Sequence, residues 1–270
     1  MIYLNAFRLP NRTLSNPNIY PYNVFAKKNE KCLLFDKITI LYGNNACGKS
    51  TLLNIIANSL NLIGKEEVKA FGLVDYFNTF INECAYELGE DDEGQKYSSV
   101  PENSSYIKSE DIMYEVKKIQ QEAVLKEGYV YEHAKKGYNK EQRDELKKSK
   151  KMHNQIDIIK FCQEKYSNGE MSLQVFDDYL QANALFLLDE PEVSLSPQNQ
   201  VLLAEKINSG ARFFNNQFII ATHSPFMLGT LAAKIYNFDS QDMDVCSWSK
   251  LENVRYFYDY FKKHQNEFEE

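Results

Sequence analysis

Residues 43–50 have the types and the spacing of a phosphate-binding loop, G-x-x-x-x-G-K-[ST]: Gly43-Asn44-Asn45-Ala46-Cys47-Gly48-Lys49-Ser50. Glycine lets the backbone curl so that consecutive N–H groups point at phosphate oxygens, and the N-terminus of a following helix adds partial positive charge. Lys49 is predicted to reach the β- and γ-phosphates of a nucleotide, and the Ser50 hydroxyl to ligate Mg²⁺. Together with Thr51 these residues form the predicted ATP-binding segment. The alternative is a plain turn between a strand and a helix.

Two adjacent carboxylates follow an apolar run. Asp189 and Glu190 come directly after residues 184–188, whose uninterrupted apolar sequence is typical of a strand buried on both faces. Ligands of open parallel sheets bind at the carboxyl ends of the strands, which is where these two side chains would lie. Asp189 is predicted to hold Mg²⁺ through water, and Glu190 to orient or deprotonate the water that attacks the phosphate. The alternative is a solvated strand end.

A histidine follows the next predicted strand. His223 lies in Thr222-His223-Ser224, directly after residues 217–221. A single histidine is usually a hydrogen-bonded polar residue without a role in chemistry. Because parallel strands end at the same edge of a sheet, His223 is nevertheless predicted to contact the γ-phosphate.

A fourth polar stretch, Ser167-Asn168-Gly169-Glu170, offers a hydroxyl, an amide, a bare backbone and a carboxylate ahead of a helix expected over residues 173–180. Taken alone, it has the pattern of a helix cap, with Ser167 as the N-cap and Glu170 as the reciprocal member of a capping box. By itself the stretch therefore predicts only the start of a helix.

The elements that must position these residues are predicted from periodicity and from turn residues. Strands are expected over residues 1–9, 37–42, 184–188, 217–221 and 234–238. Helices are expected to begin near Lys49 and at Ser196-Pro197, and the second is expected to end at Ser209-Gly210. Strands and helices that alternate in this way predict an α/β fold with a mostly parallel sheet.

The middle of the chain has a different character. Residues 111–165 have a helical pattern and include a basic cluster over residues 135–151. The expected organisation is one domain. Its core lobe covers about residues 1–65 and 173–250, its helical lobe about residues 66–172, and a terminal amphipathic helix about residues 251–268. The basic cluster could contact DNA phosphates, although a solvated helical face is the commoner explanation for such a pattern.

The composition is that of a soluble globular protein. The 270 residues, 43% of them hydrophobic, can bury a core, and a net charge of −7 gives no global attraction to nucleic acid or to anionic membranes. The five cysteines are scattered, as is usual for reduced cytosolic thiols. The sequence shows no recognisable signal peptide and no apolar run of the roughly 18 residues that a membrane helix needs. A cytoplasmic location is expected.

The order of the motifs resembles that of ABC-type ATPases. The phosphate loop is followed by Tyr166-Ser167-Asn168-Gly169-Glu170, by Leu187-Leu188-Asp189-Glu190-Pro191 and by Thr222-His223-Ser224, and the first of these three aligns without a gap with the signature loop LSGGQ. More narrowly, the chain resembles the small, soluble, bacterial ABC-type ATPases labelled "AAA family ATPase", which are SMC- and RecF-like. The resemblance covers about residues 1–60 and 104–265. It implies a P-loop NTPase fold, an ABC-type ATPase head with a mostly parallel sheet core and an inserted helical lobe.

In that family two subunits pack head to tail around ATP. The resemblance implies that the signature loop, Ser167, Asn168, Gly169 and Glu170, caps the γ-phosphate held by the other subunit of a homodimer. Two departures from the family pattern are visible. Pro197 stands where transporters usually have Asp, and the glutamine that normally senses water and metal is not recognisable, so that Lys108 or Glu110 is expected to border the site instead.

The predicted activity is hydrolysis of Mg-ATP by a soluble homodimer that switches conformation and serves a separate effector protein in regulation or defence. A DNA repair or maintenance ATPase of the SMC or RecF type is the main alternative. An ATP-binding subunit of a transporter is disfavoured, because no coupling segment around a glutamine loop is recognisable.

Overall fold

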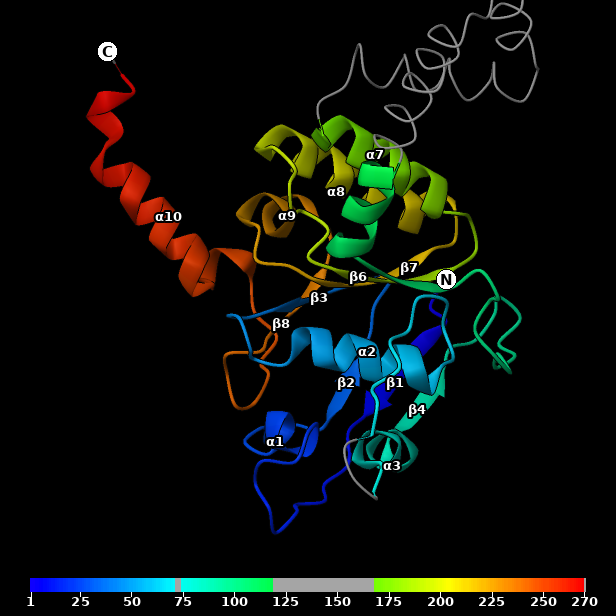
Figure 1. The fold of residues 1–270 in the computed structure, drawn as a ribbon. Coiled ribbons are helices and arrows are strands. Elements are labelled where there is room, and N and C mark those ends of the chain that lie inside the picture. Colours follow the sequence, from blue (N-terminus) through cyan, green and yellow to red (C-terminus); the bar gives the residue numbers. More distant parts are fainter. Residues whose placement is uncertain (71–73, 119–167, 270) are drawn as a thin grey trace, which may run out of the picture. The chain divides into compact units, whose positions relative to one another are not determined.

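The computed structural model describes residues 1–70, 74–118 and 168–269 (Figure 1). By contact, the chain divides into two compact units. The first consists of Met1–Ser109, Leu180–Val193 and Gln200–Glu270, and the second of Glu110–Tyr179 and Ser194–Asn199. Residues 66–109, which the sequence pattern places in a helical lobe, belong to the first unit, because their strands pair with its sheets.

Within the described residues, the first unit contains a parallel sheet of five strands in the order β5-β6-β7-β3-β8. The strands are β3 (Ile38–Tyr42), β5 (Ser105–Lys108), β6 (Leu185–Asp189), β7 (Gln217–Ala221) and β8 (Lys234–Asn237). All four pairings are parallel. Every residue of β3, β6 and β7 is buried, which accounts for their nearly continuous apolar sequences. The predicted α/β fold with a parallel sheet is confirmed.

Helix α2 (Lys49–Ser59) starts at the predicted residue and packs on this sheet. Its Leu52, Leu53 and Ile56 are fully buried in the same core as Leu187 of β6 and Ile219 of β7. Each such side chain contributes roughly 1.5–3 kcal/mol by leaving water. Figure 1 shows α2 on one face of the sheet, with α8 (Pro197–Phe213) and α9 (Pro225–Thr230) on the other.

A second, antiparallel sheet of the first unit has the order β2-β1-β4, with β1 (Leu4–Arg8), β2 (Cys32–Leu34) and β4 (Ala85–Leu88). Two short helices accompany it, α1 (Tyr22–Phe25) and α3 (Tyr76–Glu83). The buried amide of Gln217 joins the two sheets. Its Oε1 accepts from the N–H groups of Tyr3 and Leu4, both at 2.8 Å, and its Nε2 donates to the Leu4 carbonyl at 2.8 Å. A polar first residue in β7 is therefore a link between sheets.

Helix α8 extends past the predicted stop at Ser209-Gly210 and ends at Phe213. The reason lies in packing, because a Cβ at Gly210 would come within 3.1 Å of the Phe218 ring. Gly210 is thus small in order to let the helix approach β7, and it does not end the helix.

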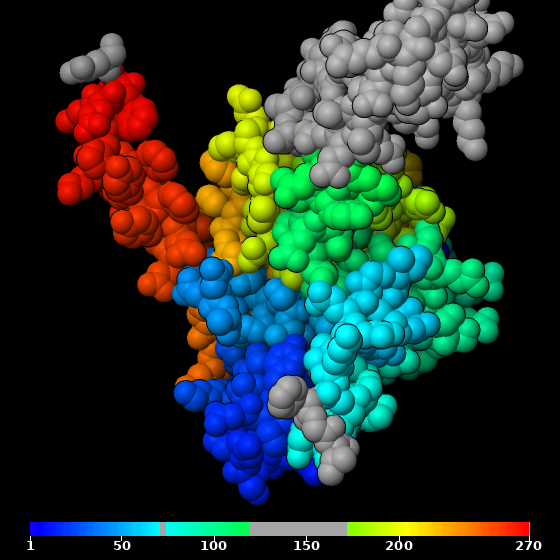
Figure 2. Space-filling view, viewed as in Figure 1, coloured from blue at the N-terminus to red at the C-terminus, as the bar shows by residue number. Residues whose placement is uncertain are grey.

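The terminal helix α10 (Glu252–Lys263) is shorter than the expected residues 251–268 and is followed by a 3₁₀ turn over Gln265–Glu267. Its five aromatic side chains are all exposed, and Figure 2 shows the helix itself in red and orange.

The described part of the second unit contains helical residues 110–118 and α7 (Asn168–Tyr179). Ile112 and Val116 are buried, as their spacing predicts. The predicted basic cluster over residues 135–151 lies outside the described residues, as does Ser167. Among the residues that the structure describes, no helix is both long and apolar enough to cross a membrane.

Candidate nucleotide-binding site

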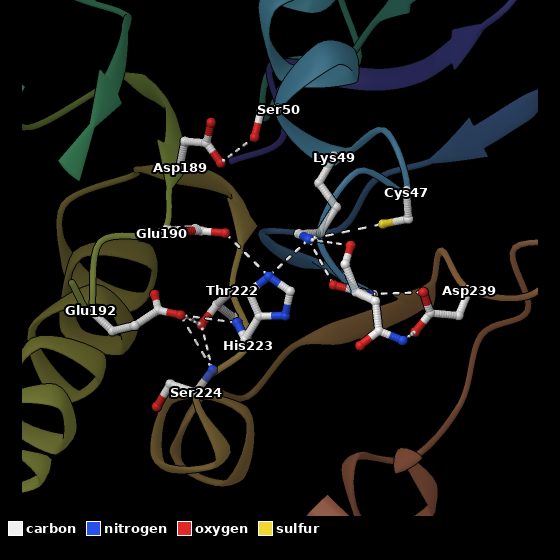
Figure 3. Close-up of polar contacts among 12 residues, drawn as sticks. Cys47, Lys49, Ser50, Asp189, Glu190, Glu192, Thr222, His223, Ser224 and Asp239 are labelled. Atoms are coloured by element: carbon white, nitrogen blue, oxygen red, sulfur yellow. Dashed lines mark hydrogen bonds and ion pairs between the residues drawn. The ribbon is translucent and has the colours of Figure 1, made fainter. Parts of the chain in front are cut away.

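The predicted phosphate loop, the two carboxylates and the histidine meet at the carboxyl ends of the parallel strands, as Figure 3 shows. The phosphate loop follows β3, Asp189 ends β6 with Glu190 next to it, and His223 stands two residues after β7. Because β7 lies between β3 and β6, it delivers His223 to a position between Lys49 and Glu190.

Both glycines of the phosphate loop are required by close contacts. Gly48 immediately precedes α2 with a φ of +105°, and a Cβ there would lie 2.6 Å from Val24 Cγ1. A Cβ at Gly43 would lie 2.7 Å from Cys47 Sγ. Another residue would be strained by the backbone conformation at Gly48 and would crowd Cys47 at Gly43, so both positions favour glycine.

The Lys49 side chain is buried and folds back over the loop. Its Nζ donates to the carbonyls of Gly43 at 2.7 Å and Asn44 at 3.2 Å, and lies 2.9 Å from His223 Nε2. Lys49 Nζ also lies 3.9 Å from Cys47 Sγ. An ammonium group has three protons, so a phosphate that binds Lys49 competes with these partners.

Asp239, which sequence reasoning did not identify, anchors the start of the loop. Its Oδ1 accepts from the backbone N–H of Asn44 at 2.8 Å, and its Oδ2 from the Asn44 side-chain amide at 3.1 Å. Asp239 follows β8 by two residues. The rule that identified Asp189 and His223, a polar residue after a parallel strand, could have identified it too.

The Asp189 carboxylate joins two elements. It accepts hydrogen bonds from the Ser50 hydroxyl at Oδ1 and from the Tyr106 hydroxyl at Oδ2, both at 3.0 Å. Burial raises the pKa of Asp189, and the two hydrogen bonds oppose that rise. Tyr106 was missed because the sequence Ser105–Lys108 of β5 has no pattern that predicts a strand ending at the site.

Ser50 and Asp189 fit the predicted Mg²⁺ site. Mg²⁺ takes oxygen ligands and is commonly held by one or two protein groups together with substrate phosphates and waters. The two side chains present adjacent oxygens, from the first turn of α2 and from the end of β6, on the side of the phosphate loop.

Tyr106→Phe should raise the Mg²⁺ concentration that nucleotide binding requires. The buried Asp189 carboxylate loses one of its two hydrogen-bond donors, so the pKa of Asp189 rises further. Loss of such a supporting hydrogen bond typically weakens metal affinity by about tenfold to a hundredfold. The measurement is a Mg²⁺ titration of the binding of a fluorescent ATP analogue. Tyr22→Phe is the matched control, because it removes a hydroxyl that donates to Glu83 at 2.8 Å, in another part of the first unit. An identical Mg²⁺ requirement in Tyr106→Phe and in the wild type would refute the role.

Glu190 directs its carboxylate to His223 through an unusual backbone conformation. Its φ is +49°, a left-handed conformation that costs a non-glycine residue about 1–3 kcal/mol. Its N–H donates to the Ala221 carbonyl at 2.9 Å, which helps to hold the turn. Glu190 Oε1 then lies 3.1 Å from His223 Nε2. In the neutral imidazole Nε2 either accepts from Lys49 or donates to Glu190, so the tautomer decides which contact is a hydrogen bond.

The helix expected over residues 173–180 begins earlier than predicted, because Asn168, Gly169 and Glu170 are the first residues of α7. Ser167 lies outside the described residues, so the signature-loop assignment stays a prediction. Lys108 pairs in register with Asp189 across β5 and β6 and forms an ion pair with Glu66. That Lys108 or Glu110 borders the site stays a prediction.

Comparisons with known proteins agree with a nucleotide-binding site. A family model described as "AAA domain, putative AbiEii toxin, Type IV TA system" matches residues 77–229, which is more than half of the chain. The chain belongs to this family. No curated protein matches its sequence.

Several solved structures resemble the AAA-domain chain in fold. An SMC head domain from Thermotoga maritima is 13% identical, with 87% of this chain and 94% of that chain covered and a TM-score of 0.44. An SMC head bound to the C-winged helix domain of ScpA is 16% identical, with 87% and 93% covered and a TM-score of 0.47. A nucleotide-free ATP-binding cassette from an ABC transporter is 12% identical, with 88% and 87% covered and a TM-score of 0.40. At these values the likeness is one of general fold only.

Family membership, the five-stranded parallel sheet and the phosphate-binding loop agree with one another. The AAA-domain chain is a P-loop NTPase, as the sequence predicts.

Proposed function

We propose that this AAA-domain protein binds Mg-ATP and hydrolyses it at the carboxyl edge of the five-stranded sheet. The observation that carries the proposal is the continuous line of contacts from Lys49 through His223 to Glu190, beside the Ser50–Asp189 pair. These groups are a cation, an imidazole and a carboxylate, and they occupy one edge next to a loop built to bind phosphate.

Each side chain has a role that follows from its place. Lys49 stabilises the negative charge of the β- and γ-phosphates. Ser50 and Asp189 hold Mg²⁺, which neutralises phosphate charge when bound. Glu190 orients the attacking water and accepts its proton, and His223 contacts the γ-phosphate from between Glu190 and Lys49. Catalysis then depends on positioning and on charge stabilisation.

We propose further that hydrolysis occurs in an ATP-dependent homodimer. The support is the resemblance of residues 166–170 to the ABC signature loop. Ser167 and the Gly169 backbone would contact the γ-phosphate held by the other subunit, so that ATP binding and hydrolysis close and open the dimer. The proposed switch serves a separate effector protein in defence or regulation. The family description, which associates the domain with type IV toxin–antitoxin systems, supports the defence or regulatory setting.

Ser167→Arg should keep the ATP affinity of the monomer but lose dimerisation and most turnover, because the phosphate loop is untouched while the partner's γ-phosphate site receives a bulky side chain. Turnover is followed as phosphate release, and dimerisation by size-exclusion chromatography. Ser99→Arg is the matched control, because Ser99 is an exposed serine of the first unit.

A mixture of Ser167→Arg and Lys49→Ala chains tests sharing across the interface. In such a heterodimer one of the two composite sites has both halves intact, so part of the turnover should return. If Ser167→Arg alone hydrolyses ATP at the wild-type rate, residues 167–170 are only a helix cap, and the shared-site proposal is wrong.

A further inference from the structure

A third carboxylate, Glu192, lies behind the loop that carries His223. Its Oε1 accepts three hydrogen bonds: from the Thr222 hydroxyl at 2.6 Å, from the His223 backbone N–H at 2.9 Å and from the Ser224 N–H at 3.3 Å. Figure 3 shows Glu192 on one side of this loop and the imidazole of His223 reaching towards Lys49 and Glu190 on the other. A single oxygen atom thus accepts hydrogen bonds from three consecutive residues.

The two oxygens of Glu192 have different surroundings. Oε2 is buried and has no hydrogen-bond partner among the described residues, whereas Oε1 has three. Burial raises the pKa of Glu192, and the hydrogen bonds from Thr222 and His223 oppose this rise. The three hydrogen bonds therefore need only one acceptor oxygen at residue 192. The neutral side-chain amide of glutamine also supplies one.

The same loop is held at its other end. The Ser224 hydroxyl caps α9 by accepting from the N–H groups of Phe226 at 3.2 Å and Met227 at 3.1 Å, and it donates to Gln200 Oε1 of α8 at 2.6 Å. Because Ser224 is tied to two helices and Glu192 holds the N–H of His223, the backbone from which the imidazole extends is held on both sides.

We propose that Glu192 is a positioning residue whose Oε1 orients the loop at residues 222–224, so that His223 faces Lys49 and Glu190. This inference rests on the proposed function and deepens it, because it assigns a support to the residue that contacts the γ-phosphate. Glu192 stands two residues after Glu190 in the run Asp189-Glu190-Pro191-Glu192, and it contacts the backbone of His223, whereas Glu190 contacts the ring.

Glu192→Ala and Glu192→Gln separate positioning from charge. The alanine variant removes the acceptor of all three donors, so kcat should fall by about a hundredfold, the size of effect expected when a reacting group is misplaced by about 1 Å, with the KM for ATP unchanged. The glutamine variant keeps an oxygen at the place of Oε1 and should restore most of the lost turnover. Glu83→Ala is the matched control, because it removes a carboxylate that accepts from Arg12 at 2.6 Å and from Tyr22 at 2.8 Å in another part of the first unit. It should leave kcat unchanged.

A readout that does not depend on turnover keeps this inference distinct from the proposed function. The chain has four histidines, so its imidazole nitrogen signals can be resolved by ¹⁵N NMR, with His223 assigned from a His223→Gln variant. The His223 signals should move in Glu192→Ala and stay in place in Glu192→Gln. If the wild type hydrolyses no ATP, the proposed function fails while these signals still decide the role of Glu192. Unmoved His223 signals in a folded Glu192→Ala protein, or a kcat equal to that of the wild type, would overturn the positioning role.

Discussion

Lys49→Ala should abolish measurable ATP binding. The buried ammonium is the cation of the phosphate loop, and its partners are weak acceptors that a phosphate would replace. Charge-assisted hydrogen bonds are worth about 1.5–3 kcal/mol each, so the loss of two phosphate contacts raises Kd by a factor of about 10²–10⁴. Titration with a fluorescent ATP analogue measures the change directly.

The control for Lys49→Ala is Lys234→Ala. Lys234 is partly buried and, like Lys49, donates to a backbone carbonyl, that of Leu34 at 3.0 Å. It lies at the first residue of β8, at the opposite end of the strands from the site. The Lys234→Ala variant should bind the ATP analogue with the affinity of the wild type. Circular dichroism establishes that both variants are folded. An unchanged affinity in folded Lys49→Ala would remove the phosphate-loop assignment.

Glu190→Gln should retain ATP binding and nearly stop hydrolysis. Glutamine keeps the shape of the side chain and can still contact His223 Nε2, but it cannot accept a proton from the attacking water. Loss of a general base typically costs a factor of about 10²–10⁴ in rate. Single-turnover phosphate release measures this step separately from binding.

The same variant should accumulate as an ATP-dependent dimer, because nucleotide that is bound but not hydrolysed stabilises the state that binds it. Size-exclusion chromatography with and without Mg-ATP shows the shift. Glu205→Gln, which changes an exposed glutamate of α8, is the matched control and should behave as the wild type. A wild-type rate of phosphate release by Glu190→Gln would show that Glu190 is not the base.

Short-range sequence features were sufficient for the parts of the site that lie on contiguous residues. The phosphate loop could be recognised because its glycines, lysine and serine act within a single turn between β3 and α2. The buried strands β6 and β7 could be recognised because burial on both faces demands apolar residues along each strand. The carboxyl-end rule then placed Asp189, Glu190 and His223 at one edge without knowledge of the strand order.

Local pattern was less reliable where packing decides between alternatives. Gly210 has the residue type of a helix C-terminus, yet it lies within α8, where the absence of a side chain lets the helix pack against Phe218. The strands β4 and β5, within residues 66–109, have no strong alternation, so only their pairing with β1 and β6 shows that they belong to the first unit. Helix α7 likewise begins at Asn168, earlier than the start expected at residue 173.

The sequence by itself determined the chemistry that the edge of the sheet can offer: a phosphate loop, two carboxylates and an imidazole, each at the end of a strand or turn. Only the tertiary structure decided which of these groups touch. The order of the strands sets His223 between Lys49 and Glu190, and long-range packing brings Tyr106 to Asp189 and Asp239 to Asn44. The physical reason is that periodicity and turn chemistry act over a few residues, whereas strand order and hydrogen-bond partners depend on groups that are 83 and 195 residues apart in the sequence.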